Sequence, residues 1–181
     1  MPTPTESITG YIRAKDSNRP HLLDAVFAAD ATVQMHVQTD AISFPSLLQG
    51  RDAIADTLVR RFNQTYENIY TLCVGEAPLA SALTYSCDWF VVMSEKQSGA
   101  VRVGCGRYDW WFAVPDYTVK CLAITIVEMG NYSPDTLRSV MSLVSPLPYP
   151  WCGRHLALQA LVGSEPLRRV HDFLHRQVDQ T

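Results

Sequence analysis

Long hydrophobic runs, runs of basic residues and paired cysteine motifs are all missing from this chain of 181 residues. The longest apolar stretch, CLAITIV at positions 121–127, is far shorter than the roughly 20 residues that a membrane-spanning helix needs. The formal net charge is −3 and no basic cluster occurs, which argues against a nucleic-acid partner. The first ten residues, MPTPTESITG, lack the charged and apolar regions of a secretory signal. We therefore expect a cytoplasmic protein that binds neither nucleic acid nor membrane.

The cysteines are few and unpaired in pattern. Five occur, at positions 73, 87, 105, 121 and 152, and none forms a CxxC motif. An odd number without close pairs predicts neither a disulfide framework nor a zinc site, so we expect buried thiols. We predict no metal and no cofactor. Hydrophobic residues make up 47% and charged residues 18% of the chain, which is typical of a folded globular protein.

The first half of the chain has mostly helical periodicity. Apolar residues recur at helical spacing in ESITGYIRAKD (6–16), RPHLLDAVFAAD (19–30) and GRDAIADTLVRRF (50–62). The segment ATVQMHV (31–37) alternates instead, which predicts a short strand. We therefore expect three N-terminal helices with one strand between the second and the third.

From residue 68 the period changes to two. Four segments of roughly ten residues alternate in this way: NIYTLCVGEA (68–77), LTYSCDWFVVM (83–93), AVRVGCGRYDWWF (100–112) and TVKCLAITIVEM (118–129). Short links with turn-forming residues favour an antiparallel meander. The expected fold class is α+β, with a curved, mainly antiparallel sheet that forms a cone around the three N-terminal helices.

The last fifty residues differ from the rest. SPDTLRSVMSLV (133–144), RHLALQALV (154–162) and SEPLRRVHDFLHRQV (164–178) are predicted helices. We therefore divide the chain into a cone at residues 1–130 and a helical extension at residues 131–181. The sequence leaves open whether the extension packs on its own cone or on a partner subunit.

Four short segments in a fixed order resemble a known family. YIRAKD, FAADATV, GRDAI and GRYDWWF are together similar to the nuclear-transport-factor-2-like superfamily, and in particular to its SnoaL-like branch. The resemblance implies a deep pocket between the helices and the concave face of the sheet. That superfamily contains isomerases, dehydratases, cyclases, epoxide hydrolases and non-enzymatic binders, so it does not name a reaction.

The strand GCGRYDWWF supplies the main candidate site. Alternate residues of a strand share a face, which groups Arg107, Asp109 and Trp111. We expect this set to face the pocket, with Asp109 as a catalytic acid or base, Arg107 beside it and Trp111 against the ligand. The R-x-D pattern is similar to the arrangement in limonene epoxide hydrolase. The alternative is an ion pair that only fixes the strand.

The other face of the same strand holds three aromatic side chains. A monomer rarely exposes so large an apolar patch. We therefore expect a homodimer that forms through the outer face of the sheet, with contacts from Tyr108, Trp110 and Phe112.

Two further candidates lie in the first predicted helix. Tyr11 is similar in position to the pocket tyrosine of ketosteroid isomerases and dehydratase-like members, where a phenol donates to a substrate oxygen. The alternative is an ordinary core tyrosine. Asp16 lies five residues further on, a spacing that the dehydratase-like members share, and we expect it near the ligand. The alternative for Asp16 is a helix cap.

The strand at 31–37 departs from the isomerase pattern. Met35 stands where the resemblance implies the general-base aspartate, so we expect Met35, together with Phe62, to line the pocket instead. His36 is a catalytic candidate only if the strand ends or bulges there, because neighbouring residues of a strand face opposite sides. The alternative is a solvent-facing histidine.

Two functions fit this set of residues. The first is a cofactor-independent lyase, isomerase or cyclase that acts on a small apolar organic substrate by acid–base chemistry. The second is a non-catalytic ligand-binding or dimerising module on the same fold. Whether the protein is an enzyme is left open by the sequence.

Overall fold

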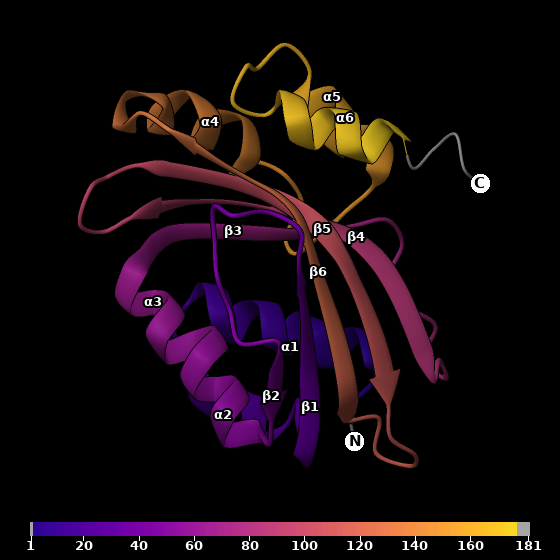
Figure 1. The fold of residues 1–181 in the computed structure, drawn as a ribbon. Helices are drawn as coiled ribbons and strands as arrows, with labels where there is room; N and C mark the ends of the chain where they lie inside the picture. The colour runs from indigo at the N-terminus through magenta and orange to yellow at the C-terminus, as the bar shows by residue number, and fades with distance from the viewer. Residues whose placement is uncertain (1, 177–181) are drawn as a thin grey trace.

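The computed structural model describes residues 2–176, which build a mixed α+β fold around one seven-stranded sheet (Figure 1). The strands are in the order β2-β1-β6-β5-β4-β3-β7. Their bounds are β1 (Phe27–Val37), β2 (Leu47–Gln49), β3 (Tyr66–Val74), β4 (Thr84–Glu95), β5 (Val101–Phe112), β6 (Val119–Tyr132) and β7 (Trp151–Cys152). The helices are α1 (Pro4–Asp16), α2 (Arg51–Ala55), α3 (Phe62–Thr65), α4 (Leu137–Val144), α5 (Arg154–Leu161) and α6 (Arg168–Arg176).

The predicted meander is confirmed. Strands β3, β4, β5 and β6 pair antiparallel with their neighbours in chain order. Strand β1 pairs in parallel with β6, and the short β7 pairs in parallel with β3 at the opposite edge. Within residues 2–176 no helix combines the length and the apolar character that crossing a membrane requires.

The predicted helix at 19–30 is wrong. A short 3₁₀ turn covers Pro20–Asp24, and β1 begins at Phe27. The Val26 carbonyl accepts a hydrogen bond from the Val119 amide, and Phe27 pairs with Val119 on β6. Leu23, Val26 and Phe27 are buried, as a helix would also have buried them. The pairing with β6 therefore overrides a sequence pattern that fits a helix equally well.

The sheet has a separate hydrophobic core on each face. Helices α1, α2 and α3 lie against its concave face, and α4, α5 and α6 lie over its convex face (Figure 1). A π-helical turn, Asp56–Arg61, joins α2 to α3. On the convex side, Val140, Leu161 and Val170 belong to one buried cluster with Phe90 and Val103. The C-terminal helices thus pack on the sheet of their own chain.

The faces of β5 are the reverse of the expected ones. Tyr108, Trp110 and Phe112 are buried in the concave core, so the prediction that they form an outer dimer surface is wrong. The Tyr11 ring of α1 meets the Tyr108 and Trp110 rings edge-on, with centroids 6.1 and 5.5 Å apart. The large rings fill the space below α1, whereas Arg107 and Asp109 lie on the convex side.

The glycines of GCGRYDWWF allow β6 to pass very close to β5. A Cβ atom at Gly106 would lie 1.8 Å from the Thr125 carbonyl oxygen, and one at Gly104 would lie 2.5 Å from the Met129 side chain. The register between β5 and β6 shifts at this point, between Cys105 and Gly106. Glycine is therefore required beside this bulge, where β6 contains one extra residue, Val127.

Candidate ligand pocket

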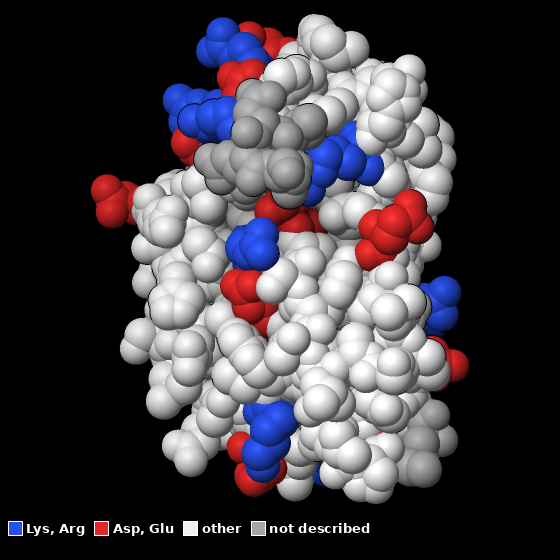
Figure 2. All heavy atoms as spheres, turned by 90° about the vertical axis from the view of Figure 1, so that its right-hand side faces the viewer, with Lys and Arg blue, Asp and Glu red and all other residues white. Residues whose placement is uncertain are grey.

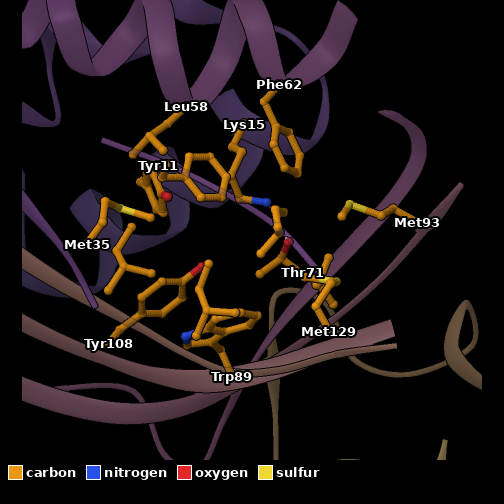
Figure 3. Close-up of a pocket in the computed structure, with 15 residues that line it drawn as sticks. Tyr11, Lys15, Met35, Leu58, Phe62, Thr71, Trp89, Met93, Tyr108 and Met129 are labelled. Atoms are coloured by element: carbon orange, nitrogen blue, oxygen red, sulfur yellow. Dashed lines mark hydrogen bonds between the residues drawn. The ribbon is translucent and has the colours of Figure 1, made fainter. Parts of the chain in front are cut away.

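A pocket lies between α1, the α2–α3 segment and the concave face of the sheet (Figure 3). Its cavity volume, counted as the space that the centre of a water molecule can occupy, is about 50 Å³. Apolar and aromatic side chains dominate its wall, among them Leu58, Phe62, Val91, Ile124, Ile126 and Met129. Ile42 and Phe44 close it from the loop 38–46, which joins β1 to β2.

One side of this apolar wall carries an ammonium group. Lys15 comes from the last turn of α1 and is buried. Its Nζ donates to Asp16 Oδ1 at 2.6 Å and to Thr71 Oγ1 at 2.7 Å, and it lies 4.9 Å from the centroid of the Phe62 ring. In Figure 3 the Lys15 side chain enters the cavity from α1 with its nitrogen toward Thr71.

Asp16 is the centre of the hydrogen bonds behind this wall. Its side chain is 2% exposed and accepts from the Thr71 amide at 2.8 Å, the Thr71 hydroxyl at 2.9 Å and the Tyr149 hydroxyl at 2.8 Å. Asp16 is the last residue of α1, and the carboxylate bonds to β3 and to the segment before β7 rather than to a helix terminus. It therefore holds Lys15 and does not serve as a cap.

Two phenols also line the pocket. Burial, and after it the Asp16 charge, raises the pKa of Tyr11, with a hydrogen bond to Tyr108 acting in the opposite direction. Burial likewise raises the pKa of Tyr108 well above its usual value, and Tyr11 adds to the effect. Both groups therefore stay protonated at physiological pH and can donate hydrogen bonds.

The site residues predicted on α1, β1 and α3 lie in or beside the pocket. Tyr11, Met35 and Phe62 line it, and Asp16 reaches it through Lys15. His36 is exposed on the opposite face of β1, as strand alternation requires, so its predicted place in the site is wrong. The strand pairs regularly with β6 through this position and does not bulge there.

The residues predicted on β5 lie outside the pocket. The Arg107 and Asp109 side chains are 48% and 29% exposed, with Arg107 Nε 3.3 Å from Asp109 Oδ1. Arg107 also lies 3.8 Å from the buried Asp88 of β4, and Trp111 is exposed on the same convex face. The expected orientation of Arg107, Asp109 and Trp111 is therefore wrong. The side of the molecule where β4 and β5 lie has a few charged groups of both signs close together on a mostly uncharged surface (Figure 2).

Asp88 belongs to a structural connection on the convex side. Its Oδ2 accepts a hydrogen bond from Arg154 at 2.6 Å, and Arg154 also donates to the Leu174 carbonyl at 3.0 Å. The arginine thus joins β4 to α6. In residues 2–176 no group of three or more His, Cys, Asp or Glu side chains is arranged to hold a metal ion.

Comparison with known proteins identifies the fold. No family model matches the sequence, and no curated protein matches it. Among solved structures, a nuclear transport factor 2 (NTF2-like) superfamily protein from Salmonella enterica matches with a TM-score of 0.52 at 14% identity, over 71% of this chain and 88% of that one. The chain has an NTF2-like fold.

Two other solved structures with this NTF2-like fold are informative. A hypothetical protein with a ketosteroid isomerase-like fold from Catenulispora acidiphila, solved in complex with trimethylamine, has a TM-score of 0.52 at 20% identity, over 79% of this chain and 94% of that one. The epoxide hydrolase/cyclase-like enzyme SalBIII, described for pyran ring formation in the polyether salinomycin, has a TM-score of 0.52 at 10% identity, over 71% of this chain and 95% of that one. At these identities the likeness establishes the fold alone.

Two residues of the pocket, Lys15 and Thr71, were not predicted from the sequence. Lys15 follows Tyr11 by four positions, so the two share one face of α1, and this spacing could have found it. Thr71 alternates with the inward-facing Ile69 and is therefore on the concave face of β3. Tyr108 was seen but assigned to the wrong face.

Proposed function

We propose that this protein binds a small, mostly apolar organic molecule in the pocket below α1. The observation that carries the proposal is a group of hydrogen-bond donors, Lys15, Tyr11 and Tyr108, in a wall that is mostly apolar. Apolar cavities with a few converging polar groups are typical of small-molecule sites. A bound small molecule in a protein with the same fold supports this use of the scaffold.

The size of the cavity limits what it holds in this conformation. One water molecule needs a cavity volume of about 10–15 Å³, counted in the same way. The cavity of about 50 Å³ therefore accepts only a few heavy atoms. A larger ligand requires Ile42 and Phe44 to move, and both lie in the loop 38–46 outside any helix or strand. The backbone carbonyl of Ala41, in the same loop, accepts a hydrogen bond from Arg102 of β5.

Ligand binding is tested by mass spectrometry of the native protein for a co-purifying molecule, followed by thermal unfolding with a panel of apolar compounds. A bound ligand stabilises the folded state by about 2.7 kcal/mol at one hundred times its Kd. Leu58→Phe adds volume to the pocket wall and should abolish the rise in Tm. Leu79→Phe, at an exposed position, is the matched control and should behave like the wild type. An equal response from Leu58→Phe would contradict the assigned pocket.

A second candidate is a cofactor-independent lyase, isomerase or cyclase. It is favoured by the buried ammonium of Lys15 beside two protonated phenols, since such donors stabilise a developing enolate or alkoxide. The described pocket wall contains no carboxylate or imidazole, and Asp16 behind it already accepts from four donors. Binding is therefore the primary proposal. Conversion of a bound compound by the wild type and its loss in Tyr11→Phe would favour the enzyme instead.

A further inference from the structure

The Lys15 ammonium has hydrogen-bonding capacity that the described protein atoms do not use. An ammonium carries three N–H donors. Two are directed to Asp16 and Thr71, at 2.6 and 2.7 Å. Within residues 2–176 the third has no hydrogen-bond acceptor, and the ammonium lies over the face of the Phe62 ring, 4.9 Å from its centroid. Because Lys15 lines the pocket, an oxygen atom of a ligand can supply the missing acceptor.

The surrounding contacts hold the ammonium in place. The Thr71 amide and the Tyr149 hydroxyl both donate to Asp16 Oδ2, which fixes the partner of Lys15. The Asn63 side chain donates to the Lys15 carbonyl at 2.7 Å and to the Val59 carbonyl at 2.8 Å, which fixes the end of α1. A preorganised donor of this kind loses little freedom when a ligand binds.

The other polar groups of the wall are donors as well. Tyr11 and Tyr108 are protonated, because burial raises the pKa of both. The indole Nε1 of Trp89, another residue of the wall, is buried and has no hydrogen-bond partner among the described residues. The N–H groups of Lys15 and Trp89 can only donate, so a ligand that pairs with them must present an acceptor. The two phenols can donate or accept, and they do not select between the two kinds of ligand.

The charge of the wall selects between acceptors. Lys15 and Asp16 form an ion pair with no net charge, and the described wall contains no other lysine, arginine, aspartate or glutamate. A neutral acceptor leaves this balance unchanged. A carboxylate or phosphate would place a second negative charge close to Asp16 in an apolar surrounding, which is unfavourable.

We propose that the pocket recognises the oxygen of a neutral carbonyl group on an apolar molecule, such as a ketone or an aldehyde, through the third N–H of Lys15. This inference rests on the proposed function, because it assigns a ligand class to the same pocket. Tyr11 and Tyr108 add donors at the same wall, and Asp16 acts as a positioning residue for Lys15.

The test uses three ligands of nearly equal size, acetophenone, ethylbenzene and benzoate, each large enough that binding requires Ile42 and Phe44 of the loop 38–46 to move. They present a neutral carbonyl, no acceptor and an anion on the same ring. Calorimetry or NMR titration gives a Kd for each with the wild type, with Lys15→Met/Asp16→Asn and with Lys96→Met. The double variant removes the ion pair without leaving one charge buried alone. Lys96 is exposed in the turn after β4 and is the matched control.

The decisive quantity is the ratio of the Kd of ethylbenzene to that of acetophenone. Comparing this ratio between variants cancels the difference in hydration of the two ligands. A hydrogen bond to a charged group contributes about 1.5–3 kcal/mol, so the ratio should fall at least about tenfold in the double variant. It should stay unchanged in Lys96→Met. Circular dichroism and thermal unfolding establish that each variant is folded.

The other outcomes separate this inference from the proposed function. If ethylbenzene and acetophenone bind and their ratio is the same in the double variant, Lys15 does not recognise the carbonyl and the inference is wrong. If benzoate binds to the wild type more tightly than acetophenone, the ligand class is anionic and the inference is also wrong. In both cases the pocket still binds ligands. If none of the three binds to the wild type, the proposed function fails as well.

Discussion

On the concave face of β5, Tyr108 and Trp110 are buried below α1, whereas on the convex face Arg107 and Asp109 pair with each other and remain partly open to solvent. The pocket lies on the first face, yet its ion pair does not come from the strand. It comes from Lys15 and its neighbour at the end of α1, which covers that face. The polar chemistry of a strand face thus depends on the element packed over it, and the charged groups that the strand itself contributes stay on the side that reaches water.

The largest expected contrast between the two faces is in neighbouring tryptophans. Trp110→Ala should lower the free energy of unfolding by about 3–5 kcal/mol, because it empties a fully buried site. Trp111→Ala, at a position that is 43% exposed, should lower it by less than about 1 kcal/mol. Urea unfolding followed by circular dichroism measures both. Similar losses for the two would mean that the convex face is as well covered as the concave one.

A smaller contrast is expected between two carboxylates. Asp16→Asn leaves the buried Lys15 ammonium without its ion-pair partner and should reduce stability by about 3 kcal/mol. Asp109→Asn removes one partner of a partly exposed pair and should change stability by at most about 1 kcal/mol. The measurement is again urea unfolding at neutral pH. Ligand affinity should change in Asp16→Asn and not in Asp109→Asn. A change in Asp109→Asn alone would instead support the site on β5 that was predicted from the sequence.

The smallest contrast appears at alkaline pH. Burial raises the pKa of Tyr108, so in the folded state it keeps its proton at a pH where the unfolded chain has lost it. The contribution of the buried, protonated Tyr108 to the free energy of unfolding is therefore complete below the unfolded-state pKa of about 10. It decreases as the pH rises above that value. At pH 11 the decrease amounts to about 1.4 kcal/mol for one such tyrosine.

This pH effect is isolated by comparing urea midpoints of the wild type and Tyr108→Phe from pH 7 to pH 11. The wild type should lose more stability than the variant over the last unit of pH. Tyr132→Phe is the matched control, since Tyr132 is a partly buried tyrosine on the convex side, at the end of β6. Parallel curves for the wild type and Tyr108→Phe would show that the Tyr108 hydroxyl reaches solvent in the folded state.

The strand periodicity predicted the meander but not the direction of its faces. In β5 every residue from Val101 to Gly106 is buried, because the C-terminal helices cover the convex side there. A strand that is buried on both faces gives no polar alternation to show which face meets the pocket. Arg107 and Asp109 lie just beyond the part of β5 that these helices cover. Because they are charged residues in a mostly apolar strand, they were interpreted as a functional site.

The prediction of a helix at 19–30 failed for a related reason. Leu22, Leu23, Val26 and Phe27 have the spacing of an apolar helical stripe, but burial on one side is satisfied equally by a 3₁₀ turn followed by a strand. Only the pairing with a strand about ninety residues later decides between them, and a local pattern carries no information on that partner. Lys15, in contrast, was predictable from local spacing alone.

The hydrogen bond of the Tyr149 hydroxyl limits how far this protein can be truncated. Its ring is at the surface, while its oxygen binds the carboxylate that holds the pocket's ammonium. The Lys15 side of the pocket wall is thus held by a residue that comes after all four meander strands in the sequence. A fragment that stops after β6 would keep every residue lining the cavity, yet it would lose one of the four donors that fix Asp16.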